Sequence, residues 1–595
     1  MLRAMGPFSA VTILSLCSVL SLSPIAIVSA HDHRSSPACK AVPGTPDWPS
    51  DSTWARLNES TGGRLLRPSP PGAVCHPDQP TYDAAECSRI HSAWSTYEFH
   101  QNDPVSSQWN QYNNDTCLPE PSYPCSGQGY PVFVINATSA EHVKLGVDFA
   151  RKHNVRLVVK SSGHDFIGRS VAPNSLSIWV HHLKGMKAHT SFRPKCCNAK
   201  IDGPSVTVGG GEQMFDIYKY LDTLNQTAVG GGGKTVSVGG YVTGGGHSLL
   251  SARYGLATDQ VLEMEVVTPQ GEIVIANECK NKDLFWAMRG GGGSTFGIMT
   301  SVTFKTHPTP PLTAIQLVVA SYNTSSPSVF PALAYIISHY PSLGDQGLSG
   351  YSYLFSSYPN PFDGGNTNVS GLLVSFVLQD TQDPAAITSL FDPITAHVTA
   401  TWPDMVTLVT SVTTFPSFLG WYLENFDSSE SGQDLYVGSR LLDADALTGD
   451  LSASADAFRQ FASGGTATAF LVSGKGVHDA RPRGGGDAVL PAWRKAYVHA
   501  TVGVEFEPLN ATAKQEAQAA MNRLLDPLRQ LAPDSGAYVN EAAPFEPDWQ
   551  HQFWGAHYDR LSAIKRSVDP DDVLWCNPCV GNEGWEEVGD RLCRV

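Results

Sequence analysis

The chain has 595 residues, of which 42% are hydrophobic and 16% charged, so it can bury one or more substantial cores and is not a disordered tail. Its 40 Lys and Arg against 56 Asp and Glu give a formal net charge of −16, which repels polyanions and argues against a nucleic-acid partner. Much of the glycine, 54 residues in all, lies in clusters, so we expect tight turns or close approach of the backbone to a ligand.

Residues 1–30 are typical of a secretory signal peptide. Arg3 precedes an apolar run from Phe8 to Leu22, and Val28-Ser29-Ala30 has the small residues of a cleavage site. No later stretch is apolar for long enough to span a bilayer. We therefore expect a secreted, extracellular chain that begins at His31 and has no membrane partner. Seven N-glycosylation sequons agree with export: Asn58, Asn114, Asn136, Asn225, Asn323, Asn368 and Asn510.

Residues 31–125 are predicted to form a Cys-rich, loop-dominated N-terminal extension. Many of the cysteines lie here or between Cys576 and Cys593, although their connectivity cannot be derived from spacing. Cys576-Asn577-Pro578-Cys579 has the C-x-x-C spacing of zinc sites and thiol oxidoreductases, but no second cysteine or histidine pair accompanies it. We interpret it as part of a structural disulfide framework, and we predict no metal site.

From about residue 126 the pattern becomes that of a mixed α and β domain. A strand at Pro131–Ile135, a helix opened by the capping box Thr138-Ser139-Ala140-Glu141, and a strand at Arg156–Lys160 form a βαβ-like unit. Further elements are predicted as a strand at Ser205–Val208, a helix at 213–224, a hairpin of Val261–Thr268 with Glu272–Ala276, a short helix at Asp283–Met288 and a strand at Ile298–Thr306.

The proline-rich stretch His307–Pro311 marks a boundary. After it, strands at Ala314–Ala320, Leu372–Leu378 and Ala469–Val472 alternate with amphipathic helices that include Ala513–Leu528, which indicates a separate α+β layer. A helix-like stretch from Trp549 to Ser567 precedes the C-terminal cysteines.

Glycine clusters near residues 230, 244 and 290 allow three nucleotide-binding interpretations. Ala228–Thr235 ends in Gly-Lys-Thr as a P-loop does, but that motif needs glycine where Ala228 stands, and export removes the ATP supply. No cluster satisfies G-x-G-x-x-G, so a Rossmann site for NAD is unsupported. The remaining interpretation is a pyrophosphate held by the backbone N–H groups of two separate loops.

Two loops suit this role, and their residues resemble a known family. The first contains Ser161-Ser162-Gly163-His164-Asp165 and Gly168-Arg169-Ser170, and the second contains Gly239-Gly240 and Gly244-Gly245-Gly246-His247. Together with Gly255–Asp259, Trp286–Gly293, Tyr538-Val539-Asn540 and Tyr558…Lys565…Asp569-Pro570, their order and spacing resemble the vanillyl-alcohol-oxidase-type flavoproteins, and within these the berberine-bridge-enzyme-like oxidases. The resemblance covers most of residues 126–576.

The resemblance implies an α+β fold with FAD as cofactor. A PCMH-type FAD-binding domain of two α+β subdomains would span 126–310, and a substrate domain of antiparallel sheet plus helices would be inserted at 311–530. A C-terminal berberine-bridge-like segment, 531–595, would return to the FAD domain.

In this family the histidine of the first loop is bonded to the 8α-methyl group of the flavin, a position that His164 holds here. The alternative is a neutral loop histidine that hydrogen-bonds to backbone. The resemblance also implies cofactor contacts for other loop residues: Ser161, Ser162, Gly163, Asp165, Gly168, Ser170, Val236, Gly239, Gly240, Gly244, Gly245, Gly246, Ile298 and Asn540.

Bicovalent relatives carry a second anchor, a cysteine in a C-x-x-V-x-V-G-G pattern, and alignment on Val236–Gly240 places Gly233 at that position. We therefore expect a single covalent link, through His164. Three residues further on, the family places a gatekeeper beside the flavin, and a valine such as Val236 is similar to those that admit dioxygen. This favours an oxidase over a dehydrogenase.

An alcohol substrate must give up hydride to the flavin and its hydroxyl proton to a base. The resemblance points to Tyr538 as that base or as the group that orients the hydroxyl, while a strand aromatic packed in the core is the alternative. His247, His499 and Glu505 are further candidates without an assigned position.

The Cys-rich N-terminus followed by this FAD domain most resembles fungal secreted oxidases of the isoamyl-alcohol-oxidase-like group. The expected function is a secreted FAD-dependent oxidase that takes an alcohol-type, sugar or phenolic substrate and dioxygen and releases hydrogen peroxide. Two alternatives stay open: a tailoring enzyme of secondary metabolism that closes a ring or introduces a double bond, and a flavin-bearing binding protein without turnover.

Overall fold

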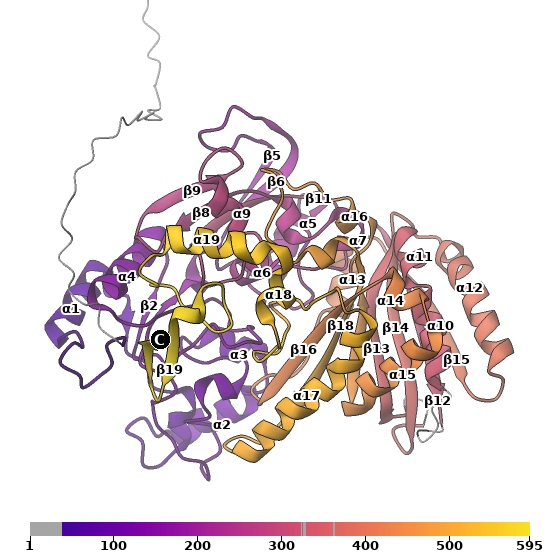
Figure 1. The fold of residues 1–595 in the computed structure, drawn as a ribbon, viewed down its shortest axis with the longest axis horizontal. Coiled ribbons are helices and arrows are strands. Elements are labelled where there is room, and N and C mark those ends of the chain that lie inside the picture. Colours follow the sequence, from indigo (N-terminus) through magenta and orange to yellow (C-terminus); the bar gives the residue numbers. More distant parts are fainter. Residues whose placement is uncertain (1–38, 323, 325–328, 361–362) are drawn as a thin grey trace, which may run out of the picture.

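The computed structural model describes residues 39–322, 324, 329–360 and 363–595; the predicted signal peptide and the sequon at Asn323 lie outside them. The first and last parts of the chain share one body, and the middle of the chain forms a large sheet with its own layer of helices (Figure 1). The predicted α+β architecture, with a large antiparallel sheet in the middle of the chain, is confirmed.

The first small sheet contains the predicted βαβ unit. Its strands are β1 (Leu65–Leu66), β2 (Phe133–Asn136), β4 (Leu176–Trp179) and β3 (Leu157–Lys160), in that order, and β4 runs parallel to both neighbours. Helix α4 (Ala140–His153) joins β2 to β3. The cap is one residue later than predicted: Ser139 accepts a hydrogen bond from the N–H of His142, and the His142 ring in turn accepts one from the N–H of Thr138.

A five-stranded antiparallel sheet follows, in the order β5 (Met186–Phe192), β6 (Ile201–Gly209), β10 (Ile298–Lys305), β8 (Val261–Val267) and β9 (Ile273–Asn277). The predicted hairpin is the pair β8 and β9. The other elements of this region are α5 (Met214–Asp222), α6 (Val238–Gly244), α7 (Ser251–Tyr254), α8 (Ala257–Gln260), α9 (Lys282–Ala287) and the small pair β7 (Gln226–Thr227) with β11 (His307–Pro308).

The third sheet has seven antiparallel strands, in the order β15 (Thr407–Phe415), β12 (Leu312–Ser321), β14 (Asn368–Gln379), β13 (Leu348–Pro359), β17 (Thr466–Leu471), β18 (Ala496–Glu505) and β16 (Leu435–Asp443). Helices cover one face and build a core with it (Figure 1): α10 (Val329–Ser338), α11 (Tyr340–Asp345), α12 (Pro384–Thr401), α14 (Ala444–Thr448), α15 (Leu451–Phe461) and α17 (Ala511–Leu531). Two short helices, α13 (Phe418–Asn425) and α16 (Lys475–His478), lie outside this layer.

The N-terminal segment contains more helix than we expected: α1 (Asp51–Ser60), α2 (Ala84–Ala93) and α3 (Tyr97–Asn102). Trp54 of α1 stacks on Phe133 of β2 with ring centroids 4.1 Å apart, so the segment shares the core of the first sheet. The local sequence shows little periodicity because these helices are short and each buries only a few apolar residues.

The C-terminal segment returns to the same body. The predicted helix from Trp549 to Ser567 is two helices, α18 (Trp549–Trp554) and α19 (Tyr558–Val568), because Gly555 between them has φ of 52°. Lys565 of α19 is buried and donates to the carbonyl of Thr295, which fastens the segment to the glycine-rich region. A last pair, β19 (Trp585–Val588) with β20 (Arg591–Arg594), ends the chain.

Disulfides link the pairs Cys39–Cys593, Cys75–Cys87, Cys117–Cys125, Cys197–Cys279 and Cys576–Cys579. The C-x-x-C motif thus forms a disulfide with itself, as part of the predicted framework, and Cys39–Cys593 joins the two ends of the described chain. Among the described residues, no helix combines the length and the apolar character that a membrane span requires.

Candidate active site

A cavity of about 850 Å³ lies where the two glycine-bearing loops meet the uncovered face of the seven-stranded sheet. Most of the predicted site residues line it: Ser161, Ser162, Gly163, His164, Asp165, Ser170, Val236, Gly239, Gly240, Ile298, Tyr538 and Asn540. Chain segments more than 370 residues apart therefore converge on one site.

Four predicted glycines do not line the cavity: Gly168, Gly244, Gly245 and Gly246. Three of them lie against side chains of the protein itself. A Cβ on Gly168 would overlap the ring of Tyr112, one on Gly244 would overlap the side chain of Asn540, and one on Gly246 would lie 2.7 Å from the ring of Tyr241. These positions require glycine because a neighbouring side chain fills the space behind the cavity wall.

His164 lies in the loop after β3, with its Nε2 2.6 Å from the hydroxyl of Thr235 and its ring 4.6 Å from that of Tyr97. Burial, together with the nearby Lys160 and His100, lowers the pKa of His164 to about 3. The imidazole is therefore neutral at any physiological pH. The buried Lys160 donates to the backbone carbonyls of His100 and Asp103, which fixes the start of this loop against the N-terminal segment.

The side chain of Arg169 connects the first loop to the C-terminal motif. Arg169 donates to the carboxylate of Asp165 at 2.5 Å, and the same Nη2 atom donates to Oδ1 of Asn540 at 3.0 Å. The other terminal nitrogen of Arg169 is buried and makes no hydrogen bond within the described residues, and the same holds for the hydroxyls of Ser161 and Ser237. All three residues line the cavity, so these polar atoms are available to a ligand.

Val236 and Gly233 lie side by side on the cavity wall. A Cβ built on Gly233 would lie 3.1 Å from Cγ2 of Val236 and 3.9 Å from the carboxylate of Asp427. A larger residue at position 233 would therefore press on Val236.

Tyr538 is buried, and its hydroxyl oxygen accepts hydrogen bonds from the N–H of Gly246 at 3.0 Å and from Nδ2 of Asn540 at 2.8 Å. Burial and the nearby carboxylate of Glu541 raise the pKa of Tyr538 above its ordinary value. With its oxygen already accepting two hydrogen bonds, the phenol is suited to donate its own proton.

The structure places the three unassigned candidates for the catalytic base differently relative to the cavity. His247 and Glu505 line the cavity, whereas His499 is fully buried behind it on β18. Glu541, which we did not predict, lines the cavity and accepts a hydrogen bond from Nε2 of His247 at 3.0 Å. It lies one residue after the Tyr538-Val539-Asn540 motif, and that proximity is the only sequence signal that could have identified it.

The seven-stranded sheet supplies the opposite wall. On β17, Thr466, Thr468 and Phe470 face the cavity, while Ala467 and Ala469 between them belong to the core beneath the helices. The two-residue period of a strand explains this alternation. Other residues of this sheet wall that the sequence analysis missed are Tyr351, Tyr353, Leu435, Val437, Thr501 and Gly503. The loop before β16 adds Phe426, Asp427, Glu430 and Gln433, and the N-terminal segment adds Tyr97 and Trp109.

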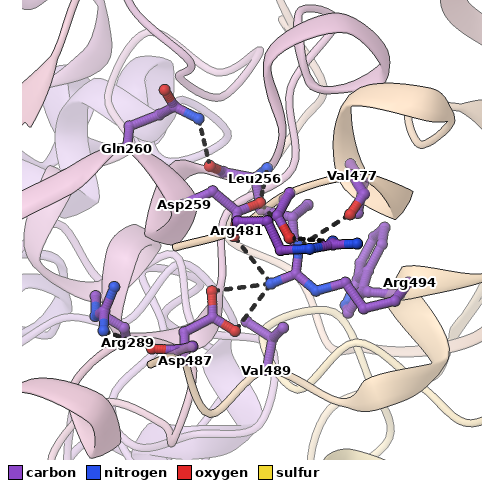
Figure 2. Close-up of polar contacts among 12 residues, drawn as sticks. Leu256, Asp259, Gln260, Arg289, Val477, Arg481, Asp487, Val489 and Arg494 are labelled. Carbon is purple, nitrogen blue, oxygen red and sulfur yellow. Dashed lines mark hydrogen bonds and ion pairs between the residues drawn. The ribbon is translucent and has the colours of Figure 1, made fainter. Parts of the chain in front are cut away.

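Asp259 and Arg289, which belong to the motifs of the resemblance, do not line the cavity. Arg494 lies between the carboxylates of Asp259 and Asp487 (Figure 2). Its Nη2 donates to an oxygen of each at 2.9 Å. Arg494 lies between α16 and β18, so this ion cluster connects the glycine-rich region to the domain of the large sheet.

The cavity fits FAD. Backbone of the second loop lies open to it at Gly240, where an added Cβ would meet nothing within 4 Å. The buried donors of Ser161, Ser237 and Arg169 point to a polar ligand. The fold and this site define a flavin-dependent oxidoreductase.

Comparison with known proteins agrees. Residues 131–277 match the family of FAD binding domains, and residues 537–581 match the family described as berberine and berberine like. The chain is 31% identical to a VAO-type flavoprotein oxidase, VAO615, of Thermothelomyces thermophilus, over 98% of this chain and 100% of that protein. It is 32% identical to the bifunctional decalin synthase calF of Penicillium decumbens, over 97% and 99%. A crystal structure of the VAO-type flavoprotein MtVAO713 from Myceliophthora thermophila C1 superposes with a TM-score of 0.87 at 29% identity, over 94% of this chain and 100% of that one.

The chain therefore belongs to the VAO-type, berberine-bridge-like family of FAD-linked oxidoreductases. The predicted cofactor, FAD, is confirmed at this level.

Proposed function

We propose that this protein is a secreted FAD-dependent oxidase that takes hydride from an alcohol-type substrate, such as a simple alcohol, a sugar or a phenolic alcohol. Bound FAD supplies the hydride acceptor, and dioxygen reoxidises it with release of hydrogen peroxide. The observation that carries the proposal is the single cavity in which His164, Val236 and Tyr538 meet a wall of hydroxyl-bearing and aromatic side chains from the seven-stranded sheet. A relative named as a VAO-type flavoprotein oxidase supports the choice of an oxidase.

We propose a single covalent attachment of FAD, through His164. Its neutral imidazole would hold FAD by bonding to the 8α carbon; the methyl group would lose a proton, and the two electrons left on the flavin would pass to dioxygen. Thr235 at 2.6 Å holds the ring in place. Gly233 has no side chain with which to form a second link.

The hydroxyl of Tyr538 is proposed to orient the substrate. Its two acceptor bonds, from Gly246 and Asn540, fix the position of the phenol, and its raised pKa keeps the proton on the oxygen. Tyr538 would then donate to the substrate oxygen, and we favour this role over that of a base. The hydroxyl proton that leaves as hydride passes to the flavin would go to a carboxylate of the cavity, for which Glu505 is the candidate.

Secretion is supported by the signal-like sequence of residues 1–30 and by the exposure of sequon asparagines. Asn114, Asn225, Asn368 and Asn510 are exposed, whereas Asn58 and Asn136 are half-buried. We propose that, in the exported chain, the four exposed asparagines are glycosylated more completely than the two half-buried ones.

A substrate screen tests the function. The purified yellow protein is incubated with a panel of alcohols, sugars and phenolic alcohols, and hydrogen peroxide is measured with a coupled peroxidase assay. Peroxide from at least one compound, lost in Tyr538→Phe while the flavin spectrum is kept, supports the proposal. A protein that binds FAD but releases no peroxide with any of them is not an oxidase of this substrate class.

A secondary-metabolite tailoring reaction is the second candidate, because one relative is named as a bifunctional decalin synthase. It would be favoured if the flavin is reduced anaerobically by a polyene or aromatic precursor and the product has a new ring or double bond.

A further inference from the structure

Three side chains from three separate segments meet at the cavity wall, His247 and Glu541 lining the cavity and His499 lying behind them. His247 follows α6, His499 lies on β18, and Glu541 follows the Tyr538 motif. Nε2 of His247 lies 3.0 Å from one oxygen of Glu541, and Nδ1 of His499 lies 3.5 Å from the other. One potential ligand atom from each residue lies within 4.8 Å of the other two.

His499 has no hydrogen bond to account for its burial. The residue is fully buried, and neither of its ring nitrogens makes a hydrogen bond within the described residues; Nδ1 of His247 is buried and unbonded as well. A buried polar group without a partner carries a desolvation cost, and an ion or a ligand can account for it.

The other groupings of potential ligands found among the described residues are explained by disulfides. They are Cys75, Cys87 and His91; His76, Cys117 and Cys125; and Cys197, Glu278 and Cys279. Every cysteine in them is disulfide-bonded.

We infer that His247, His499 and Glu541 form a binding site for a divalent transition-metal ion, with zinc as the expected occupant. Two imidazoles and one carboxylate are a ligand set that zinc takes with bonds of about 2.0–2.2 Å and a fourth position left open. Because His247 and Glu541 line the cavity, the open position faces it, where a water molecule or a substrate oxygen can bind. The acidic cavity residues Asp427, Glu430 and Glu505 favour a cation there.

The test is calorimetric titration of the flavin-loaded protein with zinc chloride. The protein is prepared without a polyhistidine tag, treated with EDTA and dialysed. We expect one zinc per chain in the wild type. Loss of a ligand in His499→Gln or Glu541→Gln should weaken zinc binding by at least about tenfold, since even residues that only support a ligand are worth that much. His397→Gln, an exposed histidine on α12, is the matched control and should bind as the wild type does.

Thermal unfolding provides a second measurement that separates loss of binding from loss of fold. Zinc should raise the Tm of the wild type and of His397→Gln, because it binds only the folded state, and should leave Glu541→Gln unchanged. Circular dichroism and the flavin absorbance show whether each variant is folded. The inference is overturned if the wild type takes up no stoichiometric zinc, or if both ligand variants take it up equally, as they would if His31 and His33 bound it. Neither readout depends on oxidase activity, so the proposed function can fail or stand independently.

Discussion

At the scale of single residues, the chemistry of the site depends on how burial sets protonation. His164 and His499 are both neutral because they are buried, yet only His164 faces the cavity. Tyr538 keeps its proton for the same reason. Such shifts depend on what surrounds a side chain and not on its type.

We predict that FAD remains on the polypeptide after denaturation. His164→Ala should release free flavin on acid precipitation or fail to bind it, because the nucleophile is gone. The measurement is flavin fluorescence of the protein band after denaturing electrophoresis, and His397→Ala serves as a control with an exposed histidine. A yellow supernatant from the acid-treated wild type would show that the bond does not exist.

The link should also be single. Peptide mass mapping of the wild type should find flavin on the peptide of His164 and on no cysteine peptide. Gly233→Cys would place a thiol in the cavity wall, but its Cβ would press on Val236 at 3.1 Å, so a second link should form more completely in Gly233→Cys with Val236→Ala. Flavin on a wild-type cysteine would contradict our alignment.

We further predict that Val236 controls the reaction with dioxygen. Val236 lines the cavity beside Gly233, and an added methylene in a packed wall narrows the path of a small molecule. Val236→Ile should slow reoxidation of the reduced enzyme, each tenfold loss corresponding to about 1.4 kcal/mol. Stopped-flow absorbance measures reoxidation, with anaerobic reduction by substrate as the internal control. Equal reoxidation rates in the wild type and in Val236→Ile would mean that Val236 only packs in the cavity wall.

At the scale of elements, short-range signals predicted the presence of helices and strands more reliably than their ends. The cap of α4 lies one residue later than predicted because the side chain of Ser139, not that of Thr138, accepts the bond from the N–H of His142, and the His142 ring, not Glu141, accepts the bond from the N–H of Thr138. The C-terminal helix divided at Gly555, whose positive φ no helical pattern reveals. Several strands of the large sheet pair with strands that are far away in the sequence. Their order in the sheet could therefore not be predicted from local sequence.

The ion cluster of Figure 2 leads to a prediction at this scale. Arg494→Met would remove the cation that pairs directly with the buried Asp259 and Asp487, a change that costs about 3–5 kcal/mol in comparable cases. We expect Tm to fall by several degrees in differential scanning calorimetry. Adding Asp259→Asn and Asp487→Asn should recover part of the loss, since the uncompensated charges are removed. An unchanged Tm in Arg494→Met would mean that the cluster does not contribute to stability.

At the scale of the whole molecule, the N-terminal segment contacts the large sheet through a buried pair of acids. Asp115 lies in that segment and Asp434 immediately precedes β16. Burial and the carboxylate of Asp115 raise the pKa of Asp434 to about 8. The pair therefore favours the folded state while it holds a shared proton.

The sign of the pH dependence follows. Because the folded pKa of Asp434 lies above the unfolded value near 4, its contribution is fully present in acid and is lost as the pH rises from about 4 to about 8. Asp434→Asn should flatten the fall of Tm over this range and raise Tm at pH 8. The exposed Asp534→Asn, the same chemical change, should leave the profile as it is. Identical profiles for wild type and Asp434→Asn would show that the pair does not titrate in this range.

The sequence by itself determined the cofactor class, the α+β architecture and most of the cavity lining near the glycine loops. Those features depend on contiguous motifs, in which the residues next to His164 and Gly240 in the sequence identify them as cofactor-site residues. Only the tertiary structure decided that the seven-stranded sheet faces the two glycine-bearing loops across the cavity. It also decided that Gly168 and Gly244 leave room for side chains of the protein, and that His247, His499 and Glu541 lie together. The physical reason is that these contacts join residues up to several hundred positions apart, and their burial, charge and spacing exist only once the sheets have packed.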